Sequence, residues 1–316
     1  MKLIGVIVTY NRLSYLKTTI AKSLEFGFDE IIIINNASND GSIEYLATLT
    51  EKKIKVLNLP ENSGGAGGFY AGLSYVREKF ESGWVCLFDD DSYPDSIREV
   101  VINRLSTFDK SVGSVAASVF LPNGSISEMN RVSTNPFKSL RALCRAIRLG
   151  RAGFHVKDED YYGSVQEIDT SSFVGCFIQI ESLIKSNVLP RKDFFIYGDD
   201  ILFTYQLTQA GFKNYFAPDI KFIHDCNSYN HNVVYTSLWK VYYLYRNGLE
   251  VYKNISGWLF PLVAVRYLCI WLKRVVHYGP NKKKYLKVMW LGIKDWAFKK
   301  YDRKFSEVNL IINAIE

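Results

Sequence analysis

Short apolar runs alternate with longer segments of helical spacing over the first 89 residues. The runs at 3–10 (LIGVIVTY) and 30–35 (EIIIIN) are rich in β-branched residues and bounded by polar ones, which is typical of strands buried on both faces. Residues 13–27 between them carry apolar side chains at helical spacing and end at a glycine, so they predict a helix. This alternation indicates an α/β fold with a mostly parallel sheet and helices on both faces.

The same alternation continues along this part of the chain. It predicts a helix at 43–50, a strand at 55–60, a glycine-rich loop at 62–72 leading into a helix that ends at residue 80, and a strand at 84–89. Ligands of such sheets bind at the carboxyl ends of the strands. Polar residues stand at four of these predicted ends, and we expect them to converge on one crevice: Thr9, Asn35, Asn62 and Asp89.

Beyond residue 95 the pattern becomes mixed. Strands are predicted within 112–125, 171–180 and 215–225, and a loop followed by a helix within 194–212. Residues 131–167 show no clean period and predict an inserted, partly helical loop or lid. The pattern at residues 236–300 predicts helices, and this segment is unusually aromatic. We therefore predict a domain at 1–245, divided into halves at 1–95 and 96–245, and a C-terminal helical, basic and aromatic region at 246–316.

Charge and cysteine content narrow the function classes. The chain has 316 residues and a formal net charge of +7, and residues 273–316, with 11 Lys or Arg and four acids, account for all of this excess. The preceding part is neutral, which disfavours nucleic-acid binding. Five scattered cysteines without CxxC spacing argue against a disulfide framework or a zinc site. These features, and an N-terminus unlike a signal peptide, predict a cytoplasmic protein.

Three consecutive aspartates, Asp89, Asp90 and Asp91, follow the last predicted strand of the first half. Three adjacent negative charges repel one another and are unfavourable without a counter-ion. A single Asp, in contrast, is common at a turn. Side chains two residues apart on an extended segment point the same way, so Asp89 and Asp91 can converge while Asp90 faces elsewhere. Two convergent carboxylates suit Mg²⁺ or Mn²⁺, which would in turn bind a diphosphate.

Two further patterns carry candidate chemistry. The acidic pair Asp199 and Asp200 precedes a predicted helix, where it serves either as a helix cap or as a general base. His224 follows a predicted strand, where it is either structural or a third ligand of the metal. The glycine-rich stretch at 62–72 matches neither a P-loop nor G-x-G-x-x-G, yet it would let backbone N–H groups approach a phosphate or sugar.

The ordered motifs VTYNR, INNASNDGS, ENSGGAGGF, FDDDS, GDD with QLTQAGF, and HD resemble the family 2 glycosyltransferases of the GT-A fold, over residues 3–248. Within that family they most resemble the bacterial galactofuranosyl- and rhamnosyltransferase branch. The resemblance implies a metal-dependent, inverting transfer from a nucleotide-diphosphate sugar to a glycan or polyprenyl-diphosphate-linked acceptor, in the synthesis of bacterial surface polysaccharide such as O-antigen or capsule. It implies UDP-galactofuranose as donor, with dTDP-rhamnose as the alternative.

The resemblance also assigns roles to individual residues. It implies Asp200 as the catalytic base and Asp89, Asp91 and His224 as ligands of Mn²⁺ or Mg²⁺. The donor-contacting positions it implies are Thr9, Tyr10, Asn35, Asn62, Gly64, Gly65 and Asp90. The sequence departs from the family pattern at Asn35, where Asp is usual, at Leu202, where an acid is usual, and at Gln206, where Arg is usual.

Two other function classes share part of this pattern. A sugar-nucleotide pyrophosphorylase would share the sheet and the acidic ligands, but it requires a glycine-rich loop near residue 10, where VTYNR has none. A non-catalytic nucleotide- or glycan-binding module remains the other alternative, given Leu202 and Gln206.

The C-terminal region carries a separate prediction. Residues 255–274 are strongly apolar but interrupted by Pro261 and Arg266, and lysines interleave with aromatic residues after them. This pattern predicts peripheral contact of 255–304 with an anionic membrane, at the inner face of the cell membrane. A helical packing or homo-oligomer surface with solvated lysines is the alternative.

Overall fold

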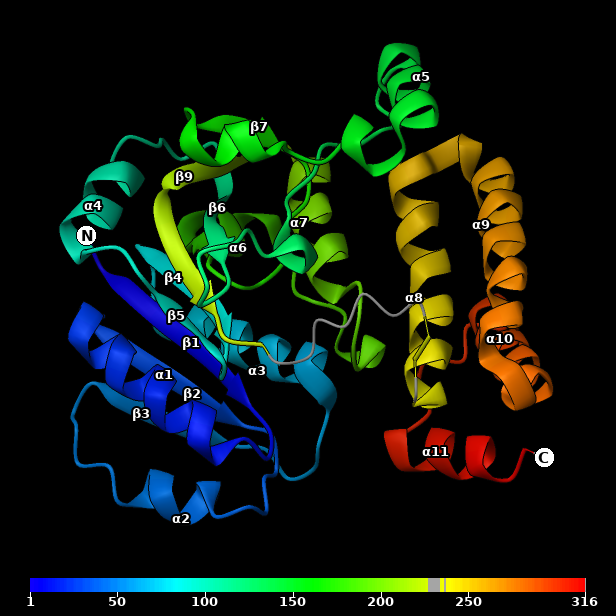
Figure 1. Cartoon of the computed structure of the whole chain (residues 1–316). Helices are drawn as coiled ribbons and strands as arrows, with labels where there is room; N and C mark the ends of the chain where they lie inside the picture. The colour runs from blue at the N-terminus through cyan, green and yellow to red at the C-terminus, as the bar shows by residue number, and fades with distance from the viewer. Residues whose placement is uncertain (227–233, 236, 316) are drawn as a thin grey trace.

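The computed structural model describes residues 1–226, 234–235 and 237–315. A twisted sheet flanked by helices forms one side of the molecule, and a group of C-terminal helices stands beside it (Figure 1). The sheet has nine strands in the order β3-β2-β1-β4-β8-β6-β9-β5, with β7 paired to β9. The predicted α/β class is confirmed.

The first half of the sheet is parallel, as the sequence predicts. Strand β1 pairs with both β2 and β4, and β2 pairs with β3. The connecting helices cover both faces: α1 packs on one apolar core and α3 on the other. Helix α1 ends at Gly27, whose positive φ of 85° closes the helix. The elements are β1 (Leu3–Thr9), α1 (Leu13–Phe26), β2 (Glu30–Asn35), α2 (Ser42–Ala47), β3 (Ile54–Asn58), α3 (Gly64–Lys79) and β4 (Trp84–Asp89).

The second half of the sheet is mixed. Strand β8 is antiparallel to both β4 and β6, whereas β6 and β9 are parallel. The short strands β5 and β7 pair antiparallel with β9. Parallel pairing is therefore limited to the first half and to β6 with β9. The elements are β5 (Ser92–Pro94), α4 (Arg98–Leu105), β6 (Val112–Phe120), β7 (Gln166–Ile168), β8 (Cys176–Gln179), α6 (Ile180–Ser186), η4 (Lys192–Phe194), α7 (Asp199–Gln209) and β9 (Lys213–His224).

The insertion predicted at 131–167 is partly helical, as expected, and it contains one regular helix whose bounds the sequence pattern did not give. Helix α5 (Leu140–Leu149) stands out from the body of the molecule (Figure 1). Short 3₁₀ turns lie on either side of it and interrupt the helical period, which hides it in a longer window. These are η1 (Glu128–Asn130), η2 (Gly150–Gly153) and η3 (Asp158–Tyr162).

The C-terminal helices have an aromatic core of their own, in which α8 packs against α9, α10 and α11. Helix α8 runs across residue 245, so the predicted boundary between 245 and 246 falls inside a helix, and the domain division stays a prediction. The elements are α8 (Leu238–Ser256), η5 (Gly257–Leu259), α9 (Phe260–Arg274), η6 (Val275–Asn281), α10 (Lys282–Ala297) and α11 (Phe305–Asn313).

The glycine-rich stretch is mostly helix, which corrects the predicted loop. Helix α3 begins at Gly64, and its glycines let it lie close to β1. A Cβ added at Gly68 would come within 2.4 Å of Val8 Cγ1, and one at Gly72 within 2.5 Å of Val6 Cγ1. The glycines therefore serve helix–sheet packing as well as the N-terminus of the helix.

Substituting Gly72 tests this packing. Gly72→Ala is expected to lower the free energy of unfolding by about 1–3 kcal/mol, because the new methyl group overpacks the contact with Val6. Gly65→Ala is the control on the same helix: nothing lies within 4 Å of its added Cβ, so stability should stay equal or rise by up to about 1 kcal/mol. Urea unfolding of both variants measures the difference. Equal stabilities would show that α3 does not need a glycine at 72.

Candidate functional site

The polar residues predicted to converge lie at one edge of the sheet. Thr9 pairs with Asn35 across β1 and β2, and Val8 pairs with Asp89 across β1 and β4. The three strands thus end side by side, as parallel strands with this register must. The strand ends therefore converge at this edge as predicted, and the crevice itself stays a prediction.

Asp89, Asp91 and His224 form an acidic cluster in which one ligand atom from each residue lies within 4.8 Å of the others. Two contacts bring the histidine there. Ser92 of β5 pairs with His224 of β9, and the backbone N–H of Asp225 donates to the carbonyl of Asp91 over 2.8 Å. Asp89 and Asp91 converge as predicted, although they are brought together by the turn between β4 and β5 and not by an extended segment.

The electrostatics of this cluster fit a divalent cation. Burial, with the carboxylate of Asp91 beside it, raises the pKa of Asp89 to about 7. Burial also disfavours the imidazolium of His224, but the carboxylates of Asp91 and Asp89 outweigh this and raise its pKa to about 10. Asp91 Oδ1 is buried 3.2 Å from His224 Nε2, and no hydrogen bond reaches it within the described part of the chain. Two carboxylates and an imidazole are a ligand set that such an ion can use.

Asn130 orients the histidine, and the sequence analysis missed it. Its Oδ1 lies 2.8 Å from His224 Nδ1, and its side chain is held in turn by Ser127 and Ser172. With Nδ1–H donating to Asn130, Nε2 faces the carboxylates, the arrangement typical of a metal-binding histidine. Only the pairing of distant segments places Asn130 here, so no sequence spacing could have revealed it.

Arg12 is a second residue that the sequence analysis left without a role, although VTYNR contains it. Its Nη1 lies 2.5 Å from Asp91 Oδ2 and 3.2 Å from Asp90 Oδ1. Burial works against its charge, but the two carboxylates outweigh this and raise the pKa of Arg12. Asp90 also accepts a hydrogen bond of 2.7 Å from Thr9 Oγ1. Asp90 therefore faces Thr9 and Arg12 rather than His224.

The predicted donor-contacting residues near α3 are linked by an amide network. Asn36, which the sequence analysis did not single out, donates to Asn62 Oδ1 and to the carbonyl of Gly64. Asn62 Oδ1 also accepts from the N–H of Gly64 over 2.9 Å. Gly65 follows on an open side of the helix. These contacts fix the N-terminus of α3 at the edge of the predicted crevice.

The other two predicted donor positions differ in accessibility. The Tyr10 side chain, one residue after β1, is exposed. Asn35 is fully buried, and its amide group bonds Asn58 Oδ1 and the N–H of Ser38. In this conformation Asn35 shapes the turn after β2, and direct contact with a nucleoside stays a prediction.

The acidic pair at 199–200 forms the first turn of α7. Burial raises the pKa of Asp200 to about 6, and the N–H of Ile201 partly offsets this. Burial and the neighbouring charges of Asp200 and Asp89 raise the pKa of Asp199 well above its usual range. The N-terminus of α7 therefore lies within electrostatic reach of the acidic cluster. Leu202, where the family has an acid, is buried against Ala66.

The loop before α7 adopts an unfavourable backbone that α8 holds in place. Phe195 and Tyr197 have positive φ angles of 63° and 70°. The buried amide of Asn247 donates to the carbonyls of Phe194, Ile196 and Tyr197, at 2.9, 2.8 and 3.1 Å. The carbonyl of Phe195 accepts from the N–H of Ala66 in α3. Asn247 thus fixes the loop whose Phe195 carbonyl contacts the N-terminus of α3.

Removing the side-chain amide of Asn247 should destabilise the folded protein. Asn247→Ala is expected to lower the free energy of unfolding by about 2–4 kcal/mol, because buried carbonyls lose their partner. Asn254→Ala is the matched control on the same helix, since among the described residues its amide bonds Glu250 alone, one turn away. Urea unfolding compares the two variants. If Asn247→Ala is as stable as Asn254→Ala, the loop does not depend on α8.

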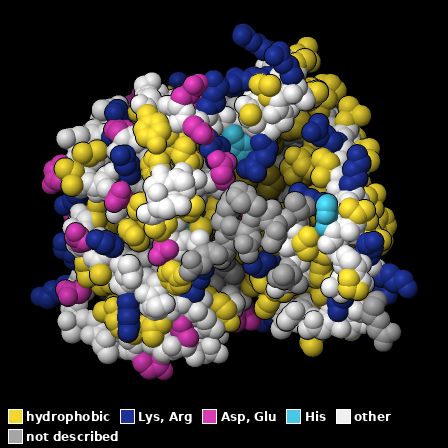
Figure 2. All heavy atoms as spheres, viewed as in Figure 1, with side chains coloured by type: hydrophobic (Ala, Val, Ile, Leu, Met, Phe, Trp, Pro, Cys, Tyr) yellow, Lys and Arg dark blue, Asp and Glu magenta, His cyan; other side chains and the backbone are white. Residues whose placement is uncertain are grey.

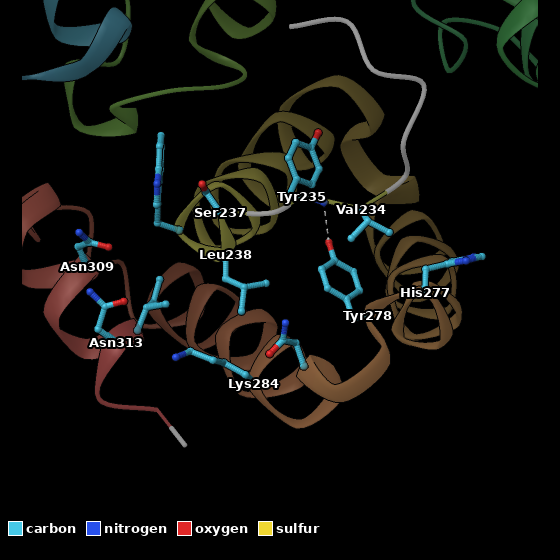
Figure 3. Close-up of a pocket in the computed structure, with 12 residues that line it drawn as sticks. Val234, Tyr235, Ser237, Leu238, His277, Tyr278, Lys284, Asn309 and Asn313 are labelled. Carbon is cyan, nitrogen blue, oxygen red and sulfur yellow. Dashed lines mark hydrogen bonds between the residues drawn. The ribbon is translucent and has the colours of Figure 1, made fainter. Parts of the chain in front are cut away.

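A separate pocket of about 680 Å³ lies among the C-terminal helices. Figure 3 shows its side chains projecting from the segments around α8, η6, α10 and α11, with the N–H of Tyr235 donating to Tyr278 Oη over 3.3 Å. Trp239, Lys284 and Asn313 are among its lining residues. None of the residues predicted for the functional site lines this pocket, so it does not belong to the predicted crevice at the strand ends.

Comparison with known proteins bears on the fold and the family. Among solved structures, GalNAc-T7 with UDP, GalNAc and Mn²⁺ matches 79% of this chain at 14% identity and a TM-score of 0.54, and this chain spans about half (51%) of its length. The mannosyltransferase PcManGT from Pyrobaculum calidifontis, with GDP-Man and Mn²⁺, matches 99% of this chain and 79% of its own at 12% identity and a TM-score of 0.53. TarS from S. aureus (residues 1–349) matches 96% of this chain and 93% of its own at 13% identity and a TM-score of 0.50.

These identities are low, so the three structures establish the fold alone. A search of curated proteins found no match. The model of the family described as glycosyl transferase family 2 matches residues 6–157, which include Arg12, the strand ends and the three aspartates. The chain therefore contains a family 2 glycosyltransferase domain with the GT-A fold.

Proposed function

We propose that this protein is a metal-dependent, inverting glycosyltransferase. The observation that carries the proposal is the cluster of Asp89, Asp91 and His224 at the carboxyl edge of the sheet, with both aspartates inside the residues 6–157 that match the family 2 glycosyltransferase model. Burial raises the pKa of Asp89 to about 7, and a cation beside it would favour its ionised form together with that of Asp91. A divalent ion that also binds a diphosphate would act in this way.

In this proposal, Asp89, Asp91 and His224 hold Mn²⁺ or Mg²⁺. The bound ion would supply Lewis-acid stabilisation of the negative charge that develops on the leaving diphosphate. Around it, Thr9, Tyr10, Asn35 and Asp90 are the proposed nucleotide contacts. Asn62, Gly64 and Gly65 are the proposed donor contacts at the positive end of α3, where the N–H of Gly64 donates to Asn62 Oδ1 in this conformation.

Asp200 is the proposed base, because its pKa of about 6 suits proton removal near neutral pH. The acceptor hydroxyl attacks the anomeric carbon from the face opposite the diphosphate and transfers its proton to the Asp200 carboxylate. A carbon–oxygen bond to the acceptor forms, and the bond to the diphosphate oxygen breaks with its electron pair. One displacement of this kind inverts the anomeric configuration.

The proposed donor is UDP-galactofuranose, and dTDP-rhamnose is the alternative. Support for this branch comes from the motif resemblance, including the histidine at 224 in the HD motif. The similar structures carry UDP with GalNAc and GDP-Man, so the fold accepts more than one nucleotide sugar and does not choose between the donors. The proposed acceptor is a glycan or a polyprenyl-diphosphate-linked sugar of a bacterial surface polysaccharide such as O-antigen or capsule.

The proposed location is the inner face of the cell membrane, reached through residues 255–304. The stretch Leu238–Ala297 is long and apolar enough to cross a membrane, and only 17% of its most apolar 18-residue segment is buried. The structure breaks this stretch into α8, α9 and α10, however, and the 15 residues of α9 reach only about 22 Å. That is short of the roughly 30 Å hydrocarbon core, so α9 is better suited to lie along the interface.

Incubation with Mn²⁺ and a panel of nucleotide sugars tests the proposal. We expect slow release of nucleoside diphosphate from one donor, with UDP-galactofuranose first and dTDP-rhamnose second, and loss of the signal with EDTA. Asp95→Asn, an exposed carboxylate outside the cluster, should leave the signal unchanged. Binding of a nucleotide sugar without any turnover, even with candidate acceptors, would instead favour a non-catalytic binding module.

A further inference from the structure

Helix α5 exposes an apolar strip that nothing in the described structure covers. Leu140 and Ile147 are 79% and 63% exposed, and Cys144 between them is exposed as well. The spacing i, i+4, i+7 places these three side chains on one face of the helix. None of the residues of α5 is buried. A soluble helix normally turns such a face toward a core.

The other exposed face of α5 is strongly basic. Arg141, Arg145 and Arg148 follow each other at i, i+4, i+7, beside the apolar strip. The surrounding segment, residues 129–157, has seven Lys or Arg and no Asp or Glu. An apolar strip bordered by arginines is the pattern of a helix that lies in the interface of an anionic membrane.

Local contacts hold α5 in this exposed position. Ser139 caps the helix by accepting from the N–H of Ala142 over 3.1 Å. Gly153 of η2 lies so close that an added Cβ would come within 2.6 Å of the Arg145 carbonyl oxygen. The helix is therefore formed and braced without burying its apolar strip.

The base of the insertion is attached to the C-terminal helices. Asn135 Nδ2, five residues before α5, donates to the carbonyl of Ile255 at the end of α8 over 3.2 Å. The next turn exposes Trp258 and Leu262, which are 85% and 70% accessible. In Figure 1, α5 and the turn between α8 and α9 lie at the same end of the molecule. In Figure 2 that end shows basic and hydrophobic side chains, whereas acidic ones lie mainly over the sheet.

We propose that α5 is a second membrane-contact element, which forms one docking surface for anionic lipid with the turn between α8 and α9. The proposal rests on the membrane contact of 255–304 given under the proposed function and adds a segment of the insertion to it. Charge complementarity favours an anionic surface. The exposed leucine and isoleucine favour lipid over a soluble anionic glycan, because only lipid offers them an apolar environment.

The chain's own cysteines allow the two surfaces to be tested separately. Cys144 lies in the strip on α5, and Cys269 is exposed on α9, while Cys86 and Cys176 are buried. A polarity-sensitive fluorophore is attached to Cys144 in a Cys226→Ala, Cys269→Ser variant, and to Cys269 in a Cys226→Ala, Cys144→Ser variant. Each labelled protein is mixed with phosphatidylcholine vesicles that contain or lack phosphatidylglycerol.

We expect both probes to shift to the blue with the anionic vesicles and neither with neutral ones. A spectral shift at Cys269 alone would overturn the role of α5 and leave the contact of α9 intact. No spectral shift at either cysteine would reject both contacts. A response at Cys144 to soluble polyphosphate but not to vesicles would also overturn the proposal. It would identify an anionic polymer as the occupant.

Unlabelled variants give an independent measurement by vesicle flotation. Leu140→Ser with Ile147→Ser should lower the partition coefficient on anionic vesicles by about tenfold, because two apolar anchors are lost. Ile97→Ser is the control, since Ile97 is 67% exposed at the start of α4, outside the proposed surface. An unchanged partition coefficient in the double variant would contradict the proposal.

Discussion

Asp91→Asn is expected to reduce Mn²⁺-dependent sugar transfer by about three orders of magnitude in kcat/KM, which corresponds to about 4 kcal/mol of lost transition-state stabilisation. Asp91 contacts both cations around the cluster: its Oδ2 lies 2.5 Å from Arg12 Nη1 and its Oδ1 lies 3.2 Å from His224 Nε2. Replacing its carboxylate with an amide removes a charged ligand while keeping the size of the side chain. The measurement is a rate assay with the preferred donor over a range of Mn²⁺ concentrations.

The control for this prediction is Asp95→Asn, four residues along the chain and exposed. Its activity and its dependence on Mn²⁺ should match the wild type. Thermal unfolding of the metal-free Asp91→Asn protein checks that the fold is retained. An Asp91→Asn enzyme with near-normal activity at low Mn²⁺ would remove this carboxylate from the metal site.

Asp200→Asn is expected to lower kcat by 10²- to 10⁴-fold, about the contribution of a general base. Because the base must be ionised and burial raises the pKa of Asp200 to about 6, wild-type kcat should rise with pH through about 6. Below that pH it should fall about tenfold per unit. In Asp200→Asn the residual rate should lose this dependence. The measurement is kcat between pH 5 and 8 at saturating donor and acceptor, a range of about one unit below to two above that pKa.

The Asp199→Asn variant distinguishes the role of Asp199 from that of Asp200, which lies in the same turn of α7. The pKa of Asp199 lies well above its usual range, raised by burial and by the charges of Asp200 and Asp89, so Asp199 is the less suited to act as an ionised base. Its variant should keep the rise in kcat through pH 6. If Asp199→Asn flattens the profile and Asp200→Asn keeps it, the role of base moves to Asp199.

The parallel half of the fold was predictable because its signals are local. Strands β1, β2 and β4 are short, largely buried apolar runs, and Gly27 marks the end of α1 in the sequence and in the structure. Asp89 and Asp91 do lie together as predicted, but the turn at residues 90–91 between β4 and β5 brings them together, not an extended segment. The start of α3 was missed because its glycines signal a loop, whereas here they allow the helix to approach Val6 and Val8.

The rest of the site depends on contacts between distant segments. Asn130 reaches His224 across 94 positions, and Asn247 holds a loop about 50 positions earlier. Neither residue belongs to a motif, and an asparagine carries no signal of its own in a single sequence. Arg12 lies in a recognised motif, but only the turn after β4 shows that it pairs with Asp90 and Asp91.

Counting bound Mn²⁺ by electron paramagnetic resonance tests the central claim most directly. With UDP or dTDP present, the wild-type protein should remove one equivalent of free Mn²⁺ from solution with tight affinity, and Asp89→Asn or Asp91→Asn should weaken this binding at least tenfold. If the wild type leaves Mn²⁺ free in the presence of either nucleotide, or if both variants bind it as the wild type does, the acidic cluster is not a metal site.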